Sequence, residues 1–273
     1  MSFRCDVKGD FRMTQDEVRF FRSWFEDYPQ RFSSEDVEVE ANLRYKKEHS
    51  LRVRDYMLTL GQELQLDTNQ LFLAEVIGLF HDVGRFEQYV KYHTFKDHES
   101  EDHAELGLLV LEREQILAGR VSELEKEIIY TAIRNHNQRV IDENVGGDTL
   151  LFCQLIRDSD KLDIFEQIIN FYEDPKRTPH LAVEENHKDQ RYSPEIIQGI
   201  LSGEQISYTS VKTPVDLKLI RLSWLLNLTF PAALEIAKRK EFFARLRAFI
   251  PETKDTLKVF KYIEQIISQQ VLK

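Results

Sequence analysis

The sequence of 273 residues predicts an all-α protein built around one large core. In almost every segment, apolar residues recur every three or four positions, which is the period of an amphipathic helix. Several of these segments begin at residues that cap helices, such as Thr14 and Ser122. Strand-like alternation is scarce, and 42% of the residues are hydrophobic. This is enough for one core with further helices attached to it.

Five helices are expected in the first half of the chain, over residues 14–28, 48–64, 67–80, 103–117 and 122–136. The first begins at the N-cap Thr14, and the last begins with a capping box formed by Ser122 and Glu125. The first two helices have clear apolar faces, formed by Val18, Phe21 and Phe25 in one and by Val53, Tyr56, Met57, Leu60 and Leu64 in the other.

The second half of the chain is also expected to be helical. A turn at residues 144–148 precedes a long helix from Thr149 to about Tyr172. Caps and prolines divide the remainder, namely Ser193-Pro194, Thr213-Pro214, Pro231 and Pro251. We therefore predict a single all-α domain over residues 1–273. Its core covers about residues 35–175, and a C-terminal helical extension at about 190–273 packs onto it.

The composition argues against several classes of function. The net charge is -10 and no basic patch dominates, which disfavours general nucleic-acid binding. No run approaches the roughly 18 apolar residues of a membrane span, and the N-terminal residues lack the pattern of a signal peptide. Cys5 and Cys153 are far apart, so neither a disulfide framework nor a thiolate metal site is predicted. We expect a cytoplasmic protein.

Six residues of types that bind metal ions, His and Asp, fall on the apolar faces or at the ends of successive predicted helices. They are His49, His81, Asp82, His103, His136 and Asp160. A single His on such a face is usually a hydrogen-bonded core residue. Six buried ionisable groups are costly unless they are paired or coordinated, so a shared cation explains the set better. The other histidines lie in polar segments and are expected at the surface, namely His93, His98, His180 and His187.

The order of a His, a His-Asp pair and a distal Asp on helices resembles the HD-domain superfamily of metal-dependent phosphohydrolases. Here the pattern is carried by His49, by the His81-Asp82 pair of "LFHDVGR" and by Asp160 of "RDSDKLD". Asp158 and Asp163 compete with Asp160, but the family's Asp-basic-Leu run matches Asp160-Lys161-Leu162 best. The resemblance covers about residues 44–165. It implies an HD-domain helical bundle with additional C-terminal helices.

The segments "HAELGLLVLE" and "AIRNHNQ" resemble those that supply two further ligands in the family, here His103 and His136. The resemblance then implies one or two divalent transition-metal ions. The first would be bound by His49, His81, Asp82 and Asp160, and the second by Asp82, His103 and His136, with Asp82 bridging. Such ligands suit Fe, Mn, Zn or Co, and also permit Mg or Ni.

Two features set the chain apart from part of the family. Some members have two adjacent histidines where this chain has His136-Asn137, and the Gly-Tyr-Pro signature of the cyclic-dinucleotide phosphodiesterase branch is missing. The leading hypothesis is hydrolysis of a phosphomonoester or phosphodiester, in a nucleotide or another small phosphorylated metabolite, by metal-activated water. The alternatives are a di-iron oxygenase of the HD-like type, similar to myo-inositol oxygenase, and a non-catalytic metal or nucleotide sensor.

Residues near the expected ligands are assigned roles under the leading hypothesis. Asp82 would hold the ions and orient the nucleophile, while Arg85 and Lys161 would bind phosphate oxygens. Lys46 or Lys47 would add positive charge. The segment of residues 92–103 is expected to border the pocket, with three side chains that orient ligands or contact substrate, namely Thr94, Asp97 and Ser100.

Overall fold

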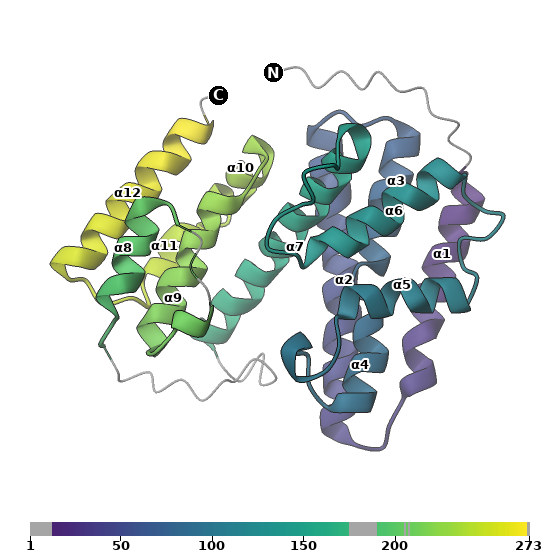
Figure 1. Ribbon diagram of the computed structural model, residues 1–273, viewed down its shortest axis with the longest axis horizontal. Helices are drawn as coiled ribbons and strands as arrows, with labels where there is room; N and C mark the ends of the chain where they lie inside the picture. Colours follow the sequence, from purple (N-terminus) through teal and green to yellow (C-terminus); the bar gives the residue numbers. More distant parts are fainter. Residues whose placement is uncertain (1–12, 175–189, 205, 207, 272–273) are drawn as a thin grey trace. The chain divides into compact units, whose positions relative to one another are not determined.

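The computed structural model describes residues 13–174, 190–204, 206 and 208–271, and these residues form helices joined by turns (Figure 1). No strand occurs in this described part of the chain, which confirms the all-α prediction. Two compact units are distinguished, residues 1–163 and 164–273, and the boundary lies inside helix α7 (Gly147–Glu173). The prediction that all helices form one domain stays a prediction.

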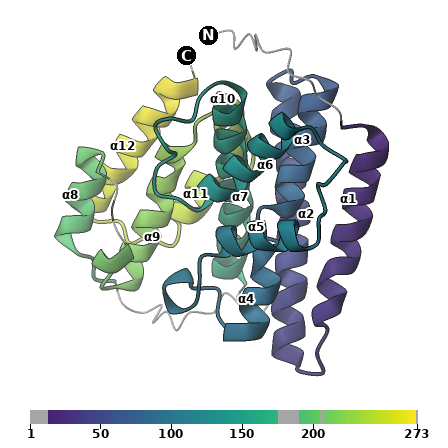
Figure 2. The ribbon, with the colours of Figure 1, turned by 45° about the vertical axis from the view of Figure 1, so that its right-hand side comes forward.

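The N-terminal unit begins with α1 (Gln15–Asp27), which packs against α3 (Thr68–Phe80). Thr14 caps α1 with the expected capping box, and the expected apolar face is buried. The ring of Phe80 on α3 contacts the rings of Phe21 and Trp24 edge to face, with centroids 5.7 and 5.6 Å apart. Figure 2 shows α1 and α3 running alongside α2 (Val37–Glu63).

Helix α2 begins eleven residues before the predicted start at residue 48, because Asp36 accepts hydrogen bonds from the amides of Glu38 and Val39 and caps it. Polar residues interrupt the apolar face in this first part, so the sequence pattern is weak there. Conversely, the predicted helix over residues 103–117 ends early. Helix α5 is His103–Arg113, and Gln115 has a left-handed backbone with φ of 52°, which stops an α-helix.

The other helices of this unit are α4 (Gly84–Tyr92) and α6 (Glu123–His136), with α6 opened by the predicted capping box of Ser122 and Glu125. Helix α4 packs on α5, α5 packs on α6, and α6 packs on α3. The start of α4 approaches α5 closely, because Gly84 faces the backbone of Gly107. This packing brings the ends of α3, α5 and α6 toward the middle of α2.

In its described residues, the C-terminal unit contains the end of α7 and the α-helices α8 (Pro194–Ser202), α9 (Pro214–Ser223), α10 (Pro231–Arg239), α11 (Phe242–Arg247) and α12 (Lys254–Val271). Thr213 caps α9 through a capping box with Asp216. Ser193 holds the N-cap position of α8, but its side chain makes no cap bond. Its hydroxyl donates instead to the buried Asp216, at 2.8 Å, and thereby ties α8 to α9.

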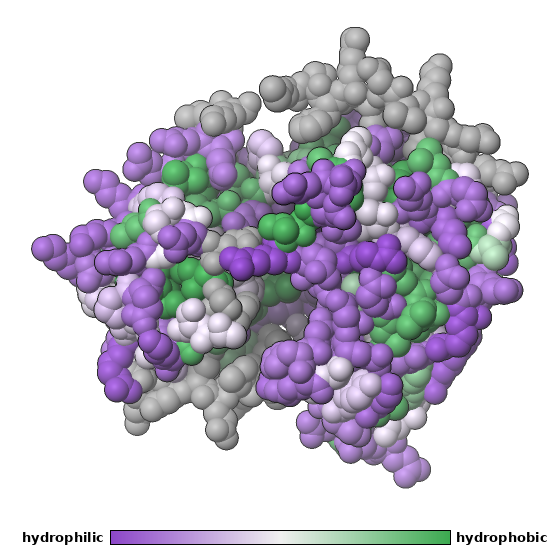
Figure 3. All heavy atoms as spheres, in the orientation of Figure 1, coloured by the Kyte–Doolittle hydropathy of each residue, from purple (hydrophilic) through white to green (hydrophobic). Residues whose placement is uncertain are grey.

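Hydrophilic residues cover most of the face drawn in Figure 3, with smaller hydrophobic patches among them. None of the described helices combines the length and the hydropathy that crossing a bilayer requires. His93 and His98 are exposed, as expected, whereas His180 and His187 lie outside the described residues.

Candidate metal centre

The six candidate ligands meet inside the N-terminal unit. His49 comes from α2, His81 and Asp82 from the junction of α3 and α4, His103 from the first residue of α5, His136 from the last residue of α6, and Asp160 from α7. The four histidines and Asp82 are buried. The side chain of Asp160 is 19% exposed, so the centre is most open on its side.

Asp82 stands between two pairs of histidines and turns one carboxylate oxygen to each. Its Oδ2 lies 3.5 Å from Nε2 of His49 and 3.8 Å from Nε2 of His81. Its Oδ1 lies 3.2 Å from Nε2 of His103 and 3.6 Å from Nε2 of His136. We call these two halves the first and the second position. The carboxylate of Asp82 therefore faces both positions.

The distances between the donor atoms fit metal coordination. The Nε2 atoms of His49 and His81 are 3.3 Å apart, and those of His103 and His136 are 3.0 Å apart. Two imidazole nitrogens bound about 2.0–2.1 Å from one ion stand about 2.9–3.4 Å apart at right-angled to tetrahedral geometry. Asp160 adds Oδ1 to the first position, 3.2 Å from Nε2 of His49. Nitrogen and carboxylate donors without thiolate suit first-row divalent ions.

The ring orientation of all four histidines is fixed through Nδ1. His81 and His136 stand at the C-terminal ends of their helices, where the last carbonyls lack an intrahelical partner. Each donates its Nδ1–H to the carbonyl three residues earlier, His81 to Gly78 at 2.9 Å and His136 to Ile133 at 2.6 Å. This bond sets the tautomer that leaves Nε2 free to bind a metal ion.

His49 and His103 are not at helix C-termini, and carboxylates bind their Nδ1 atoms. Asp163 lies 2.7 Å from Nδ1 of His49, and Asp97 lies 2.7 Å from Nδ1 of His103. Each carboxylate also accepts from an arginine, Arg52 in the first case and Arg85 in the second. Both positions thus combine one histidine held by a backbone carbonyl with one held by a carboxylate.

Burial and neighbouring charges set the protonation of the candidate ligands. Burial lowers the pKa of His81 to about 3, so its imidazole is neutral. Burial would raise the pKa of Asp82, but Lys46 and the surrounding histidines keep it well below its usual range. For His49, burial and Lys46 act to lower the pKa, but hydrogen bonds to Asp160 and Asp163 outweigh them and raise it to about 9. Ion binding at the first position would therefore release a proton.

The four cations suggested by the sequence lie in different places. Lys46 reaches the centre, with Nζ 2.8 Å from Oδ2 of Asp82, whereas Lys47 pairs with Glu26, 2.5 Å away. Arg85 also reaches it, with Nε 3.6 Å from Oδ1 of Asp82 and no hydrogen-bond partner on that buried nitrogen. For Lys161, burial lowers the pKa, while the carboxylates of Asp158 and Asp160 on the same helix oppose this shift.

The three aspartates of "RDSDKLD" occupy different environments. Asp160 faces Nε2 of His49, Asp163 binds the opposite nitrogen of the same ring, and Asp158 is fully buried. Asp163 was predicted only as a rival ligand, so its orienting role was missed. Its spacing of three residues from Asp160, almost one helical turn, was the available signal. Arg52 and the fully buried Gln88 were not suggested by the sequence at all.

Residues 92–102 border the centre as expected, and Asp97 is their main contact with it. Asn137, which departs from the paired histidine of some family members, donates to Asp102 at 2.9 Å and to Asp97 at 3.5 Å. It therefore supports the segment instead of supplying a ligand. Ser100 accepts from Gln88, and the hydroxyl of Thr94 accepts from the amide of Lys96 within the same segment.

Residues 47–164 match the family model of the HD domain, and the match includes all six candidate ligands. The chain therefore contains an HD domain, as the resemblance predicted. HD domains are usually metal-dependent hydrolases, and the buried groups of His and Asp fit such a metal site. No curated protein and no solved structure matches the chain.

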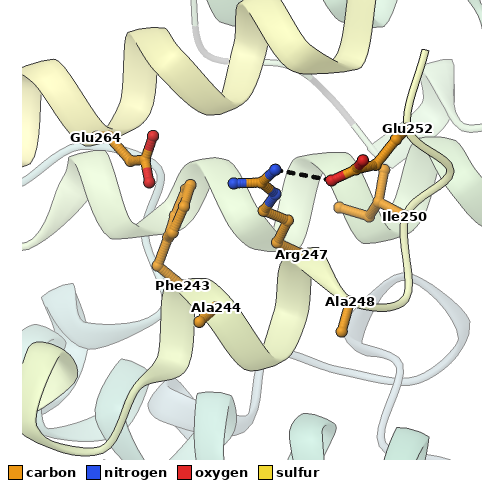
Figure 4. A pocket seen from close by; sticks show the side chains of 7 residues that line it. All are labelled: Phe243, Ala244, Arg247, Ala248, Ile250, Glu252 and Glu264. Atoms are coloured by element: carbon orange, nitrogen blue, oxygen red, sulfur yellow. Dashed lines mark hydrogen bonds and ion pairs between the residues drawn. The ribbon is translucent and has the colours of Figure 1, made fainter.

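The C-terminal unit has a pocket of about 410 Å³ beside α11 and α12 (Figure 4). Arg247 points into it and pairs with Glu252 at 2.7 Å, and Glu264 lies on another wall. Because its cation is already neutralised and a further carboxylate is present, this pocket is poorly suited to a phosphate group. None of the six candidate ligands lines it.

Proposed function

We propose that the protein is a metal-dependent phosphohydrolase that cleaves a phosphomonoester or phosphodiester of a small metabolite, such as a nucleotide. The observation that carries the proposal is the position of Asp82, with one oxygen facing each pair of histidines and a lysine at its edge. This arrangement suits two ions that share a carboxylate, and two-ion sites are common in enzymes that hydrolyse phosphoesters.

Bound divalent ions would lower the pKa of a water molecule and neutralise charge on phosphate oxygens. The protein itself would hold the metal ligands in place and bind the phosphate group of the substrate. Lys46 is the best placed anion-binding group, because its ammonium is next to Asp82 and its side chain is 13% exposed. Arg85 supplies a second cation on the opposite oxygen of Asp82. Its buried Nε is oriented by the bonds that its Nη1 makes to Gln88 and Asp97.

The remaining environment supports a small substrate. Asp160 and Lys46 retain more exposure than the buried ligands, so substrate would enter on their side. Phe95 lies beside both cations, with its ring centroid 5.2 Å from Nζ of Lys46 and 5.9 Å from Cζ of Arg85. An aromatic face next to two cations suits a nucleotide, whose base can stack while its phosphate is neutralised. We place the protein in the cytoplasm as part of the same proposal.

The test is a metal analysis of freshly purified protein followed by a phosphate-release screen over nucleotides and sugar phosphates with Mn²⁺, Fe²⁺, Co²⁺ or Zn²⁺. Lys46→Gln should lower kcat/KM roughly 10- to 100-fold, the loss expected for one hydrogen bond to a charged group. Lys47→Gln is the matched control, because its partner Glu26 is exposed and outside the centre. Metal content is measured in both variants, so that loss of an ion is not mistaken for loss of a substrate contact.

Three other results would contradict the proposal. If the protein releases no phosphate from the nucleotides and sugar phosphates of the screen with any of the four metals, hydrolysis of these substrates is excluded. Oxygen uptake with a diol or a phosphonate would indicate the oxygenase. Tight nucleotide binding without turnover in any metal would indicate a sensor.

A further inference from the structure

The two carboxylates that orient ligand histidines rest on different kinds of structure. Asp163 lies on α7 and is fully buried, and it accepts two bonds from Arg52, at 2.6 and 3.2 Å. Asp97 lies in a single 3-10 turn, Asp97–Glu99, and its side chain is 34% exposed. The first position is therefore supported by two long helices, and the second depends on residues 93–102.

Asp97 joins three helices through its carboxylate. Its Oδ1 accepts from Nη1 of Arg85 and from Nε2 of Gln88, both on α4 and both at 2.9 Å. Its Oδ2 is bonded to Nδ1 of His103, the first residue of α5, and accepts more weakly from Asn137 at the end of α6. Asp97, Asp102 and His103 also lie close enough together to suggest a metal group. These bonds, and the use of Asp102 as the cap of α5, identify them instead as support for the second position.

Side chains of α4 hold residues 93–102 in place. Arg85 donates to the carbonyl of Phe95 at 2.5 Å. Gln88 donates to the hydroxyl of Ser100 at 2.8 Å and to the carbonyl of Glu101 at 2.9 Å. Between backbone atoms, this segment makes only short-range bonds of the turn type, such as Ser100 to Asp97 at 3.1 Å. Its conformation therefore depends on a side-chain network in which Asp97 is the member that contacts a ligand.

We infer that Asp97 is a positioning residue that couples residues 93–102 to the second metal position. Filling that position orders the segment through His103 and Asp97, and an ordered segment in turn raises the affinity of that position. Such coupling is reciprocal, because it is a free energy shared by two equilibria. The first position, which is oriented by Asp163, does not take part. The inference rests on the two-position centre of the proposed function and adds a regulation of it.

The test measures Mn²⁺ binding to the full chain by equilibrium dialysis, together with hydrogen exchange in peptides that cover residues 93–102. Wild-type protein should bind two ions per chain, and Mn²⁺ should slow exchange in the segment. Asp97→Ala should weaken one class of ion about 10- to 100-fold, the usual effect of removing a group that orients a ligand. It should also abolish the Mn²⁺-dependent slowing of exchange. The other class of ion should be unchanged.

Two further variants make the result specific. Glu99→Ala is the matched control, because Glu99 lies in the same turn and pairs with Lys96, whose side chain is 63% exposed. It should bind both ions as wild type does. Asp163→Ala should weaken the other class and preserve the effect of Mn²⁺ on the segment. If Asp97→Ala does not fold, Asp97→Asn keeps the size of the side chain, removes its charge and should weaken the same class.

Unchanged Mn²⁺ binding in the Asp97 variants would overturn the inference. The inference would also be overturned if the Asp97 variants bound both classes of Mn²⁺ equally more weakly, or if wild-type protein bound only one class of Mn²⁺. If only the proposed phosphohydrolase function is wrong, the result is different. The protein then binds two ions and Asp97→Ala weakens one of them as expected, but no phosphate is released.

Discussion

Gly84→Ala tests how closely α4 and α5 must approach to build the second position. A Cβ on Gly84 would lie 2.3 Å from the carbonyl oxygen of His103 and 2.6 Å from the amide nitrogen of Gly107. Both are backbone atoms, so no rotamer change can relieve the clash. Since ordinary contacts begin at 3.4 Å, the two helices must separate by about 1.1 Å.

This separation has two measurable consequences. Overpacking a close contact costs about 1–3 kcal/mol, which at a slope of about 3 kcal/mol per M corresponds to a decrease of about 0.3–1 M in the urea midpoint. The shift also moves His103, whose distance to an ion must be correct within about 0.2 Å. We therefore expect Gly84→Ala to lose affinity at the second position while the first position, built on α2, α3 and α7, keeps its ion.

Urea unfolding followed by circular dichroism, together with Mn²⁺ content after dialysis, gives both quantities. Gly146→Ala is the matched control, because a Cβ there would meet nothing within 4 Å. A Gly84→Ala protein with the urea midpoint and the metal content of the control would show that the close approach of α4 and α5 is not required. The reasoning from packing would then be wrong.

Three more predictions concern the centre and the core. Asp82→Ala should remove ions from both positions, and His136→Ala should spare the first; unchanged metal content in Asp82→Ala would refute the bridging role. Arg22→Ala should lower stability by about 1–3 kcal/mol in urea unfolding, since it leaves the buried carboxylate of Glu75 without its partner. Arg19→Ala, with an exposed partner, should change little, and equal effects would contradict this reasoning. Burial raises the pKa of Cys153 to about 12, so a Cys5→Ser protein should react with a thiol reagent at pH 8 only after unfolding; rapid reaction of the folded protein would disagree.

The helices could be predicted because local sequence determines where most of them begin and which faces are apolar. The capping boxes at Thr14 and Ser122 use residues three positions apart, so the sequence shows them directly. The early start of α2 after its N-cap Asp36 was missed because its first turns have a weak apolar pattern. Ser193 is the N-cap of α8 as predicted, with Pro194 at the first helical position, but its hydroxyl makes no cap bond because Asp216 on another helix offers it a buried acceptor.

The candidate ligands could be located from sequence because they belong to a spaced pattern on helices, but their supports could not. Asp163 and Arg52 orient His49 from positions that are 114 and 3 residues away from it in the chain. Only the packing of α2 near α7 brings the carboxylate to the ring. The sequence also could not show which of the two lysines, Lys46 or Lys47, contacts the centre. They are adjacent in sequence, and the direction of each side chain decides which one reaches Asp82.

The place of each histidine in its helix explains the kind of support that it needs. A histidine at a helix C-terminus can use a carbonyl of its own helix, as His81 and His136 do. Within a helix the carbonyls are already bonded, and at a helix start none precedes, so His49 and His103 require carboxylates from elsewhere in the fold. Mutation can remove a carboxylate but cannot remove a backbone carbonyl. In each position, therefore, one histidine is oriented by a carbonyl that no side-chain substitution removes. A substitution that deletes an orienting group acts on the ion through the other histidine.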